Sequence, residues 1–144
     1  MKNLKKYLFL LVPLIASADL NIEKVNSILS SIKLSNNTPV SYYSKNKTFI
    51  NKLKVKKADS PTKANIVIFP KSRDNKHMFI VSSFEKLKNH EKTIGAIYLK
   101  KGRTQIMFVE ERLQKRGLKL PEKYKKYLIK ESYLCPLCLL NKIK

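Results

Sequence analysis

The sequence predicts a single three-layer α/β domain with a mixed sheet, in which a C-terminal β-hairpin is followed by two helices. Residues 64–70 (ANIVIFP) form a continuous apolar run between polar flanks, which is the pattern of a strand buried on both faces of a sheet. Strand-like runs then alternate with short helical segments, as they do in βαβ units. Residues 94–99 and 104–109 are β-prone and flank a turn that contains Gly102, which predicts the hairpin.

The first eighteen residues have the three parts of a secretory signal peptide. A lysine-rich start precedes an apolar run at residues 7–15, which is shorter than the ~20 residues of a membrane-spanning helix. Residues 16–18 (Ala-Ser-Ala) provide the small side chains of a cleavage site, so the mature chain is expected to begin at Asp19. An uncleaved N-terminal anchor is the alternative. In a bacterium, such export leads to the periplasm.

Three short elements are expected before the buried strand. Residues 19–34 have apolar positions at mostly helical spacing, with Asp19 available as N-cap and Glu23 in the first turns. A polar stretch that ends in Pro39 stops this helix, and residues 40–44 (VSYYS) then read as a short strand. One or two helical turns are expected at residues 48–53, followed by a polar connector.

The centre of the chain predicts two strands and a short helix. The strand at residues 64–70 is expected to be central and parallel to its neighbours. A loop separates it from residues 77–83 (HMFIVSS), a second apolar strand that ends in serines. Serine hydroxyls accept hydrogen bonds from the first backbone N–H groups of helices, so these serines are expected to cap a helix at residues 84–89.

The hairpin is expected at the edge of the sheet, and two helices are predicted after it. In residues 110–116 the acidic side chains come first and the basic ones last, which suits the helix macrodipole, and Gly117 stands where a helix often ends. Residues 120–131 (LPEKYKKYLIKE) predict a second helix, with Pro121 at an N1-like position and Leu120, Tyr124, Tyr127 and Leu128 on one stripe.

The charge of the chain predicts an anionic partner. Thirty-one Lys and Arg residues oppose ten acidic ones, which gives a net charge of +21. Only four are arginines, and nucleic-acid recognition favours the arginine fork, so no nucleic-acid partner is expected for an exported protein. An acidic protein domain or an anionic membrane surface is expected instead. The lysines of residues 122–130 either lie on such a membrane or form an ordinary solvated face.

Cys135 and Cys138, in the C-terminal tail (residues 132–144), are the only cysteines. A single CxxC is compatible with a redox pair, half of a zinc site or a local disulfide. Only six residues follow Cys138, too few for a thioredoxin-type site, and an oxidising compartment favours the disulfide. An intermolecular bridge is a further alternative.

No catalytic, cofactor or metal site is predicted. His77 and His90 have no carboxylate or nucleophile at a recognisable spacing and are interpreted as surface or loop residues. Glu110 and Glu111 are the only adjacent carboxylates, and the helix dipole explains their position better than catalysis does. A non-enzymatic protein is therefore expected.

Four features occur in a fixed order within residues 64–129: Val81-Ser82 at a strand end, Gly95 before the hairpin, Gly102 in its turn, and Gly117-Leu118-Lys119-Leu120 after the helix. In this order and spacing, residues 64–129 resemble the C-terminal half of the YfiR-type periplasmic regulators. The family usually has asparagine where this chain has Val109. The resemblance implies a three-layer α/β domain at residues 19–131. It also implies a non-enzymatic periplasmic protein that binds the periplasmic part of a membrane-bound diguanylate cyclase and holds it inactive.

Two other functions remain open from the residues themselves. The first is a periplasmic solute-binding module that holds a small anionic ligand through Arg73, Arg103 or nearby lysines. A closed cleft at the ends of the strands at residues 64–70 and 77–83 favours that function, whereas a flat basic face favours the regulator. The second is a metal or thiol carrier centred on Cys135 and Cys138.

Overall fold

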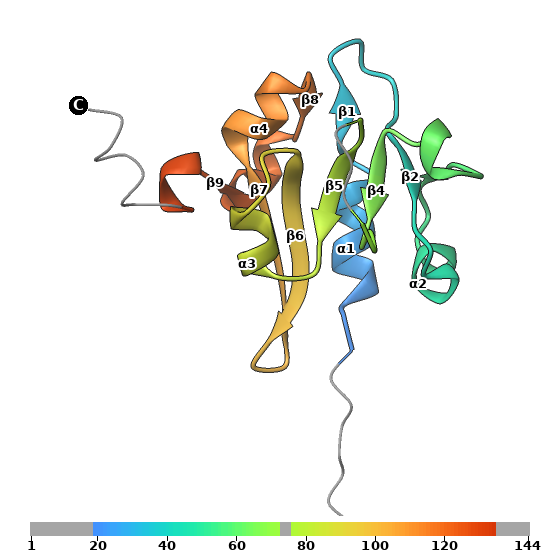
Figure 1. Cartoon of the computed structure of the whole chain (residues 1–144), viewed down its shortest axis with the longest axis horizontal. Coiled ribbons are helices and arrows are strands. Elements are labelled where there is room, and N and C mark those ends of the chain that lie inside the picture. Colours follow the sequence, from blue (N-terminus) through green and yellow to red (C-terminus); the bar gives the residue numbers. More distant parts are fainter. Residues whose placement is uncertain (1–18, 73–75, 135–144) are drawn as a thin grey trace, which may run out of the picture.

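The computed structural model describes residues 19–72 and 76–134 and shows a mixed α/β domain built on a seven-stranded sheet (Figure 1). The strands in spatial order are β3 (Lys56–Lys57), β2 (Ser41–Tyr43), β4 (Ile66–Ile68), β5 (Met78–Val81), β6 (Thr93–Lys100), β7 (Arg103–Val109) and β9 (Leu128–Ile129). A separate antiparallel pair joins β1 (Lys33–Leu34) to β8 (Leu118–Lys119). The helices are α1 (Ile22–Leu29), α2 (Lys47–Lys52), α3 (Phe84–Lys88) and α4 (Glu110–Lys115), with 3₁₀ turns η2 (Pro61–Lys63), η3 (Glu122–Tyr127) and η4 (Glu131–Tyr133). The predicted fold class is confirmed.

Side chains of the central strands alternate between two apolar layers. In β4, Ile66 and Ile68 point into the layer that holds α1 and α2, and Val67 points into the layer that holds α3. In Figure 1, α1 lies behind the sheet and α3 in front of it. All three β4 side chains are buried, as the continuous apolar run predicted for a central strand. Helices on both faces of the sheet give the three layers.

The hairpin forms as predicted but does not lie at the edge of the sheet. β6 and β7 pair antiparallel from Gly95 with Phe108 to Lys100 with Arg103. Lys101 and Gly102 both have positive φ, 50° and 73°, as two-residue hairpin turns require. β9 pairs in parallel with the outer side of β7 and is itself the edge strand, so the predicted edge position of the hairpin is wrong.

The helix boundaries follow local capping. Asn21, not the predicted Asp19, caps α1, and its side chain accepts a hydrogen bond from the backbone N–H of Lys24 at 3.0 Å. The predicted serine cap of α3 is confirmed, because the Ser83 hydroxyl accepts from the Lys86 N–H at 3.2 Å. α4 starts at Glu110 after Val109, which makes no side-chain cap.

The second helix predicted after the hairpin is a 3₁₀ segment, η3, that leads into β9. Tyr124 and Tyr127 are three residues apart, and the three-residue turn of a 3₁₀ helix places them on one side. Their ring centroids lie 6.2 Å apart, and both rings pack against the core cluster that contains α1. The apolar spacing that predicted an α-helix is therefore found in a 3₁₀ helix followed by a short strand, so the prediction of an α-helix is wrong.

The chain continues toward opposite edges of the sheet after β2 and after β4. After β2 the chain passes through α2 to β3, on the outer side, and α2 packs on the α1 side of the sheet. After β4 it moves the other way to β5 and then through α3, on the opposite face, to β6. β2 and β4 are parallel neighbours, so their carboxyl ends form a topological switch point.

Candidate anion-binding site

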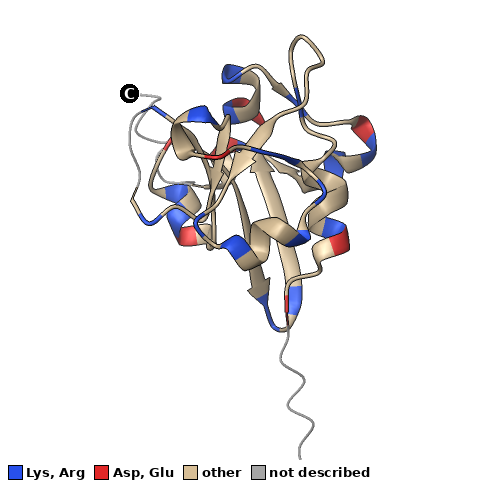
Figure 2. Cartoon of the chain, turned by 90° about the vertical axis from the view of Figure 1, so that its right-hand side faces the viewer, with Lys and Arg blue, Asp and Glu red and all other residues tan. Residues whose placement is uncertain are grey.

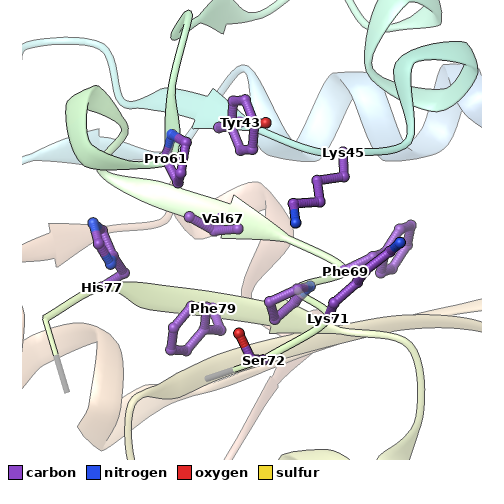
Figure 3. A pocket seen from close by; sticks show the side chains of 10 residues that line it. Tyr43, Lys45, Pro61, Val67, Phe69, Lys71, Ser72, His77 and Phe79 are labelled. Carbon is purple, nitrogen blue, oxygen red and sulfur yellow. The ribbon is translucent and has the colours of Figure 1, made fainter. Parts of the chain in front are cut away.

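A pocket of about 160 Å³ lies at this switch point and extends across the face of β2, β4 and β5 (Figure 3). We call it the switch-point pocket. The residues that line it are Tyr43, Lys45, Pro61, Val67, Phe69, Pro70, Lys71, Ser72, His77 and Phe79. In open α/β sheets, ligands bind outside the carboxyl ends of the strands at such a position. The pocket is an open depression, not the closed cleft that the solute-binding hypothesis anticipated.

The floor of the pocket is a row of three neighbouring side chains. Tyr43 pairs in register with Val67, and Val67 pairs with Phe79, so all three project from the same face of the sheet. Val67 and Phe79 are buried and Tyr43 is half-buried. The ring of His77 closes one end, with its centroid 6.4 Å from that of Phe79. The floor therefore offers mostly aromatic surface.

Two lysines stand at the other end of the pocket. Lys45 follows β2, and Figure 3 shows its side chain reaching over the pocket toward Val67. Lys71 follows β4 and lies on the rim beside Phe69, while Ser72 directs its hydroxyl over Phe79. Both lysine side chains are exposed. An anion in the pocket would meet a cation at the strand ends and rings along the floor.

The wall of the pocket depends on an unusual backbone conformation at Phe69. Its φ is 54°, a left-handed value that is rare for a bulky residue and costs about 1–2 kcal/mol. Two contacts hold it: its N–H donates to the Ile80 carbonyl at 2.8 Å, and its ring lies 5.0 Å from that of Phe49. The following residue is Pro70, which lines the pocket. Strained residues of this kind concentrate at ligand sites.

The pocket lies in a strongly basic part of the chain. Residues 45–71 contain eight lysines and one acidic residue, Asp59. The lysines are Lys45, Lys47, Lys52, Lys54, Lys56, Lys57, Lys63 and Lys71. Among the described residues none of them forms an ion pair. Figure 2 faces this side of the molecule, and blue basic positions outnumber red acidic ones across it. We call residues 45–71 the lysine-rich segment.

Arg112, which the sequence analysis did not single out, is buried but has no role in the pocket. Its Nη1 donates to the backbone carbonyls of Leu87, His90 and Thr93 at 2.8, 3.0 and 2.7 Å. Its Nε and Nη2 form a fork with the carboxylate of Glu131, with Nη2 at 2.7 Å from Oε1. These donors are used to hold α3, β6 and the C-terminal segment to α4, so the residue is structural.

The carboxylates of α4 are also structural. Glu110 forms an ion pair with Lys130, and that hydrogen bond raises the pKa of the Lys130 ammonium. Glu111 accepts a hydrogen bond from the backbone N–H of Glu131 at 2.8 Å. Both side chains tie the segment around β9 to the first turn of α4. This agrees with their interpretation as helix-end residues.

The other predicted site residues are spread over the chain. Arg103 begins β7 beside the hairpin turn and does not line the pocket. His90 is half-buried, and its Nδ1 accepts from the Lys92 N–H at 3.3 Å. His77, interpreted as a surface residue, is half-buried in the pocket wall. Arg73, Cys135, Cys138 and the predicted signal peptide lie outside the described residues.

Within residues 19–72 and 76–134, no three His, Cys, Asp or Glu side chains form a group that could hold a metal ion. The same residues contain no helix of the length and apolar character needed to cross a membrane. No family model matches the chain, and neither a curated protein nor a solved structure matches it. The site is therefore interpreted from its own geometry: an aromatic floor, lysines at the strand ends and a strained wall.

Proposed function

We propose that this chain is an exported, non-enzymatic regulator that acts by binding the acidic periplasmic domain of a membrane protein. Within the lysine-rich segment, the exposed lysines of β3 and α2 form the docking surface. An anionic membrane surface beside that domain is a further contact. By resemblance to the YfiR-type regulators, the partner is a diguanylate cyclase that is inactive while the regulator is bound.

The lysine-rich segment carries this proposal, because its lysines form no ion pair with residues 19–72 and 76–134. Lys56 and Lys57 form the exposed edge strand β3, and Lys52 is exposed on the adjacent helix α2. Complementary charge steers two proteins toward each other and rejects partners of like charge. Lysines that form no ion pair with the described part of the chain are available for this purpose. The proposed partner surface is accordingly rich in Asp and Glu.

A gene deletion tests the proposal in the producing bacterium. We expect cellular cyclic di-GMP to rise when the gene is deleted and to return when the wild-type gene is restored. The double variant Lys56→Gln/Lys57→Gln should not restore it. The matched control Lys100→Gln/Lys101→Gln removes the same charge from the exposed hairpin turn and should restore it. An unchanged cyclic di-GMP level after deletion would contradict the proposal.

Two measurements make that result interpretable. Edge lysines also discourage edge-to-edge pairing of sheets, so the size of each purified variant is measured by light scattering. A variant that stays monomeric like the wild type but does not restore cyclic di-GMP has lost docking. Export is tested separately by sequencing the N-terminus of the periplasmic protein, which should begin at Asp19.

A periplasmic solute-binding module is the second candidate function. The switch-point pocket is not the closed cleft expected for this function, but it supports ligand binding because it combines an apolar floor with lysines at the strand ends. The two functions are compatible in one chain, since the pocket covers three strands and the edge strand β3 lies outside its lining.

A further inference from the structure

The size of the switch-point pocket limits its ligand to about one ring. Its volume is about 160 Å³. Pockets for drug-sized ligands are larger, about 300–1,000 Å³, whereas a protein cavity of about 150 Å³ can hold benzene. The pocket is open on one side, so a substituent on the ring can extend beyond it.

The floor favours a flat, unsaturated ligand. Tyr43 and Phe79 flank Val67 in one row across three strands, with the ring of His77 at one end. Aromatic rings gain about 0.5–1.5 kcal/mol beyond simple burial when they stack in an offset manner or meet edge to face. A planar ring laid over this row would contact aromatic surface on both sides of Val67.

The cations favour a carboxylate substituent on that ring. Lys45 reaches over the pocket from the end of β2, and Lys71 stands at its rim after β4. A lysine ammonium is a compact point charge that pairs with a carboxylate as well as with a phosphate. Phosphate sites usually add several backbone N–H donors, and Pro70 removes one such donor from the wall.

We propose that the switch-point pocket binds a small planar carboxylate, with the ring over Tyr43, Val67 and Phe79 and the carboxylate beside the Lys45 ammonium. Phe69, with its positive φ, and Pro70 form part of the pocket wall. The Phe49 ring and the Ile80 carbonyl hold Phe69 in that conformation, so contacts within the chain itself form the wall. This inference goes beyond docking, which uses the edge lysines.

Benzoate is the probe for the test, with benzamide as its neutral isostere and inorganic phosphate as a second anion. The mature chain is labelled with ¹⁵N and titrated with each while backbone amide shifts are recorded. Benzoate should shift the amides of Lys45, Phe69 and Ser72 in a saturable manner. Benzamide should bind at least fivefold more weakly, because it lacks the charge. Phosphate should not displace benzoate at equal concentration.

Charge-matched variants locate the site. Lys45→Gln should weaken benzoate binding at least fivefold, whereas Lys52→Gln, an equal charge change on an exposed α2 residue, should stay within twofold of wild type. Tyr43→Leu keeps an apolar side chain of moderate size but removes the ring. It should weaken benzoate binding while leaving the weak binding of acetate unchanged.

Three results would overturn the inference: equal affinity for benzoate and benzamide, equal loss in Lys45→Gln and Lys52→Gln, or efficient competition by phosphate. Equal affinity for benzoate and benzamide would show that apolar contact alone binds the ring. Equal loss in the two lysine variants would show that only the overall charge matters, and competition by phosphate would show a phosphate site. The double variant Lys56→Gln/Lys57→Gln should bind benzoate like wild type even though it fails to restore cyclic di-GMP. Failure of the pocket is thereby distinguished from failure of the docking proposal.

Discussion

Charged side chains are organised differently in two parts of the sheet. In the lysine-rich segment, residues 45–71, eight lysines face one acidic residue and form no ion pair with described residues. At residues 85–131, every ion pair between described residues is found, including Arg112 with Glu131 and Lys130 with Glu110. The second part uses charge to hold the chain together. The first has lysines without an acidic partner among the described residues, although the Lys47 ammonium lies 4.9 Å from the centroid of the Tyr43 ring.

A comparison of Arg112 with Lys45 shows the difference at single residues. Arg112 is 7% exposed, and its guanidinium is satisfied by three carbonyls and one carboxylate. Lys45 is exposed and extends over a pocket. A buried cation whose three nitrogens all donate to the chain belongs to the fold, whereas an exposed cation above an apolar floor is free to meet a ligand.

Replacing Arg112 should give the largest loss of stability. Arg112→Met retains the apolar part of the side chain but removes the Arg112 donor from three carbonyls, of which that of His90 still accepts from the Thr93 N–H. It also leaves the Glu131 carboxylate without its partner, and we expect the free energy of unfolding to fall by about 2–4 kcal/mol. Lys115→Gln breaks an exposed pair with Glu91 and should cost less than about 0.5 kcal/mol. Urea unfolding followed by circular dichroism measures both. Similar losses in the two variants would contradict the conclusion that Arg112 holds α3, β6 and the C-terminal segment to α4.

Tyr42 provides the next largest effect, at alkaline pH. Burial raises the pKa of its hydroxyl above the usual range, and the hydroxyl donates to the Leu29 carbonyl at 2.7 Å. The unfolded chain ionises this group from about pH 10 and the folded chain does not. The contribution of this hydroxyl to the free energy of unfolding is therefore fully present below pH 10. Above pH 10 it should fall by up to ~1.4 kcal/mol per pH unit.

The matched variant Tyr42→Phe separates this contribution from general alkaline unfolding. At pH 7 this substitution should lower the free energy of unfolding by about 1 kcal/mol, because only the hydrogen bond to the Leu29 carbonyl is lost. Between pH 10 and 11, its stability should decline less steeply than that of the wild type. Parallel declines would show that the hydroxyl ionises in the folded state as well.

Local sequence patterns predicted most of the fold. The apolar run at Ile66–Ile68 is a central strand, Ser83 caps α3, and Gly102 forms the hairpin turn. Gly95 also has a local reason, since a Cβ there would lie 2.6 Å from the Phe108 ring. Each of these depends on neighbours in the chain or on simple periodicity. Patterns of this kind are readable without tertiary structure.

Features that depend on distant partners were missed. Leu128–Ile129 forms an edge strand because β7 offers a free side, and no alternation over two residues could reveal that. Arg112 resembles any helical arginine until its carbonyl partners, 19 to 25 residues away, are known. Lys45 and Lys71 are 26 positions apart, and only the pairing of β2 with β4 brings their strand ends together. Their positions directly after two predicted strands were the one available signal.

Thr93 should give a smaller effect of opposite sign. Its hydroxyl is buried and has no hydrogen-bond partner among the described residues, although its carbonyl accepts from Arg112. Thr93→Val replaces the hydroxyl by a methyl group of similar size in a strand, so we expect stability to increase by about 0.5–1 kcal/mol. Thermal unfolding measures it. A decrease in stability would mean that the Thr93 hydroxyl has a hydrogen-bond partner in the folded protein. Thr93 would then not be an exception to the pairing of polar groups at residues 85–131.

The edge lysines should give the smallest change in stability and the clearest dependence on salt. Lys56→Gln/Lys57→Gln reduces repulsion within the lysine-rich segment and should raise stability by a few tenths of a kcal/mol at about 10 mM salt. At about 1 M salt the Debye length is about 3 Å, and the gain should disappear. The same exchange at Lys125, which pairs with Glu122, should instead lower stability slightly at low salt. If both variants lost stability, the lysines of residues 45–71 would have partners within the chain, and the contrast between the two parts would fail.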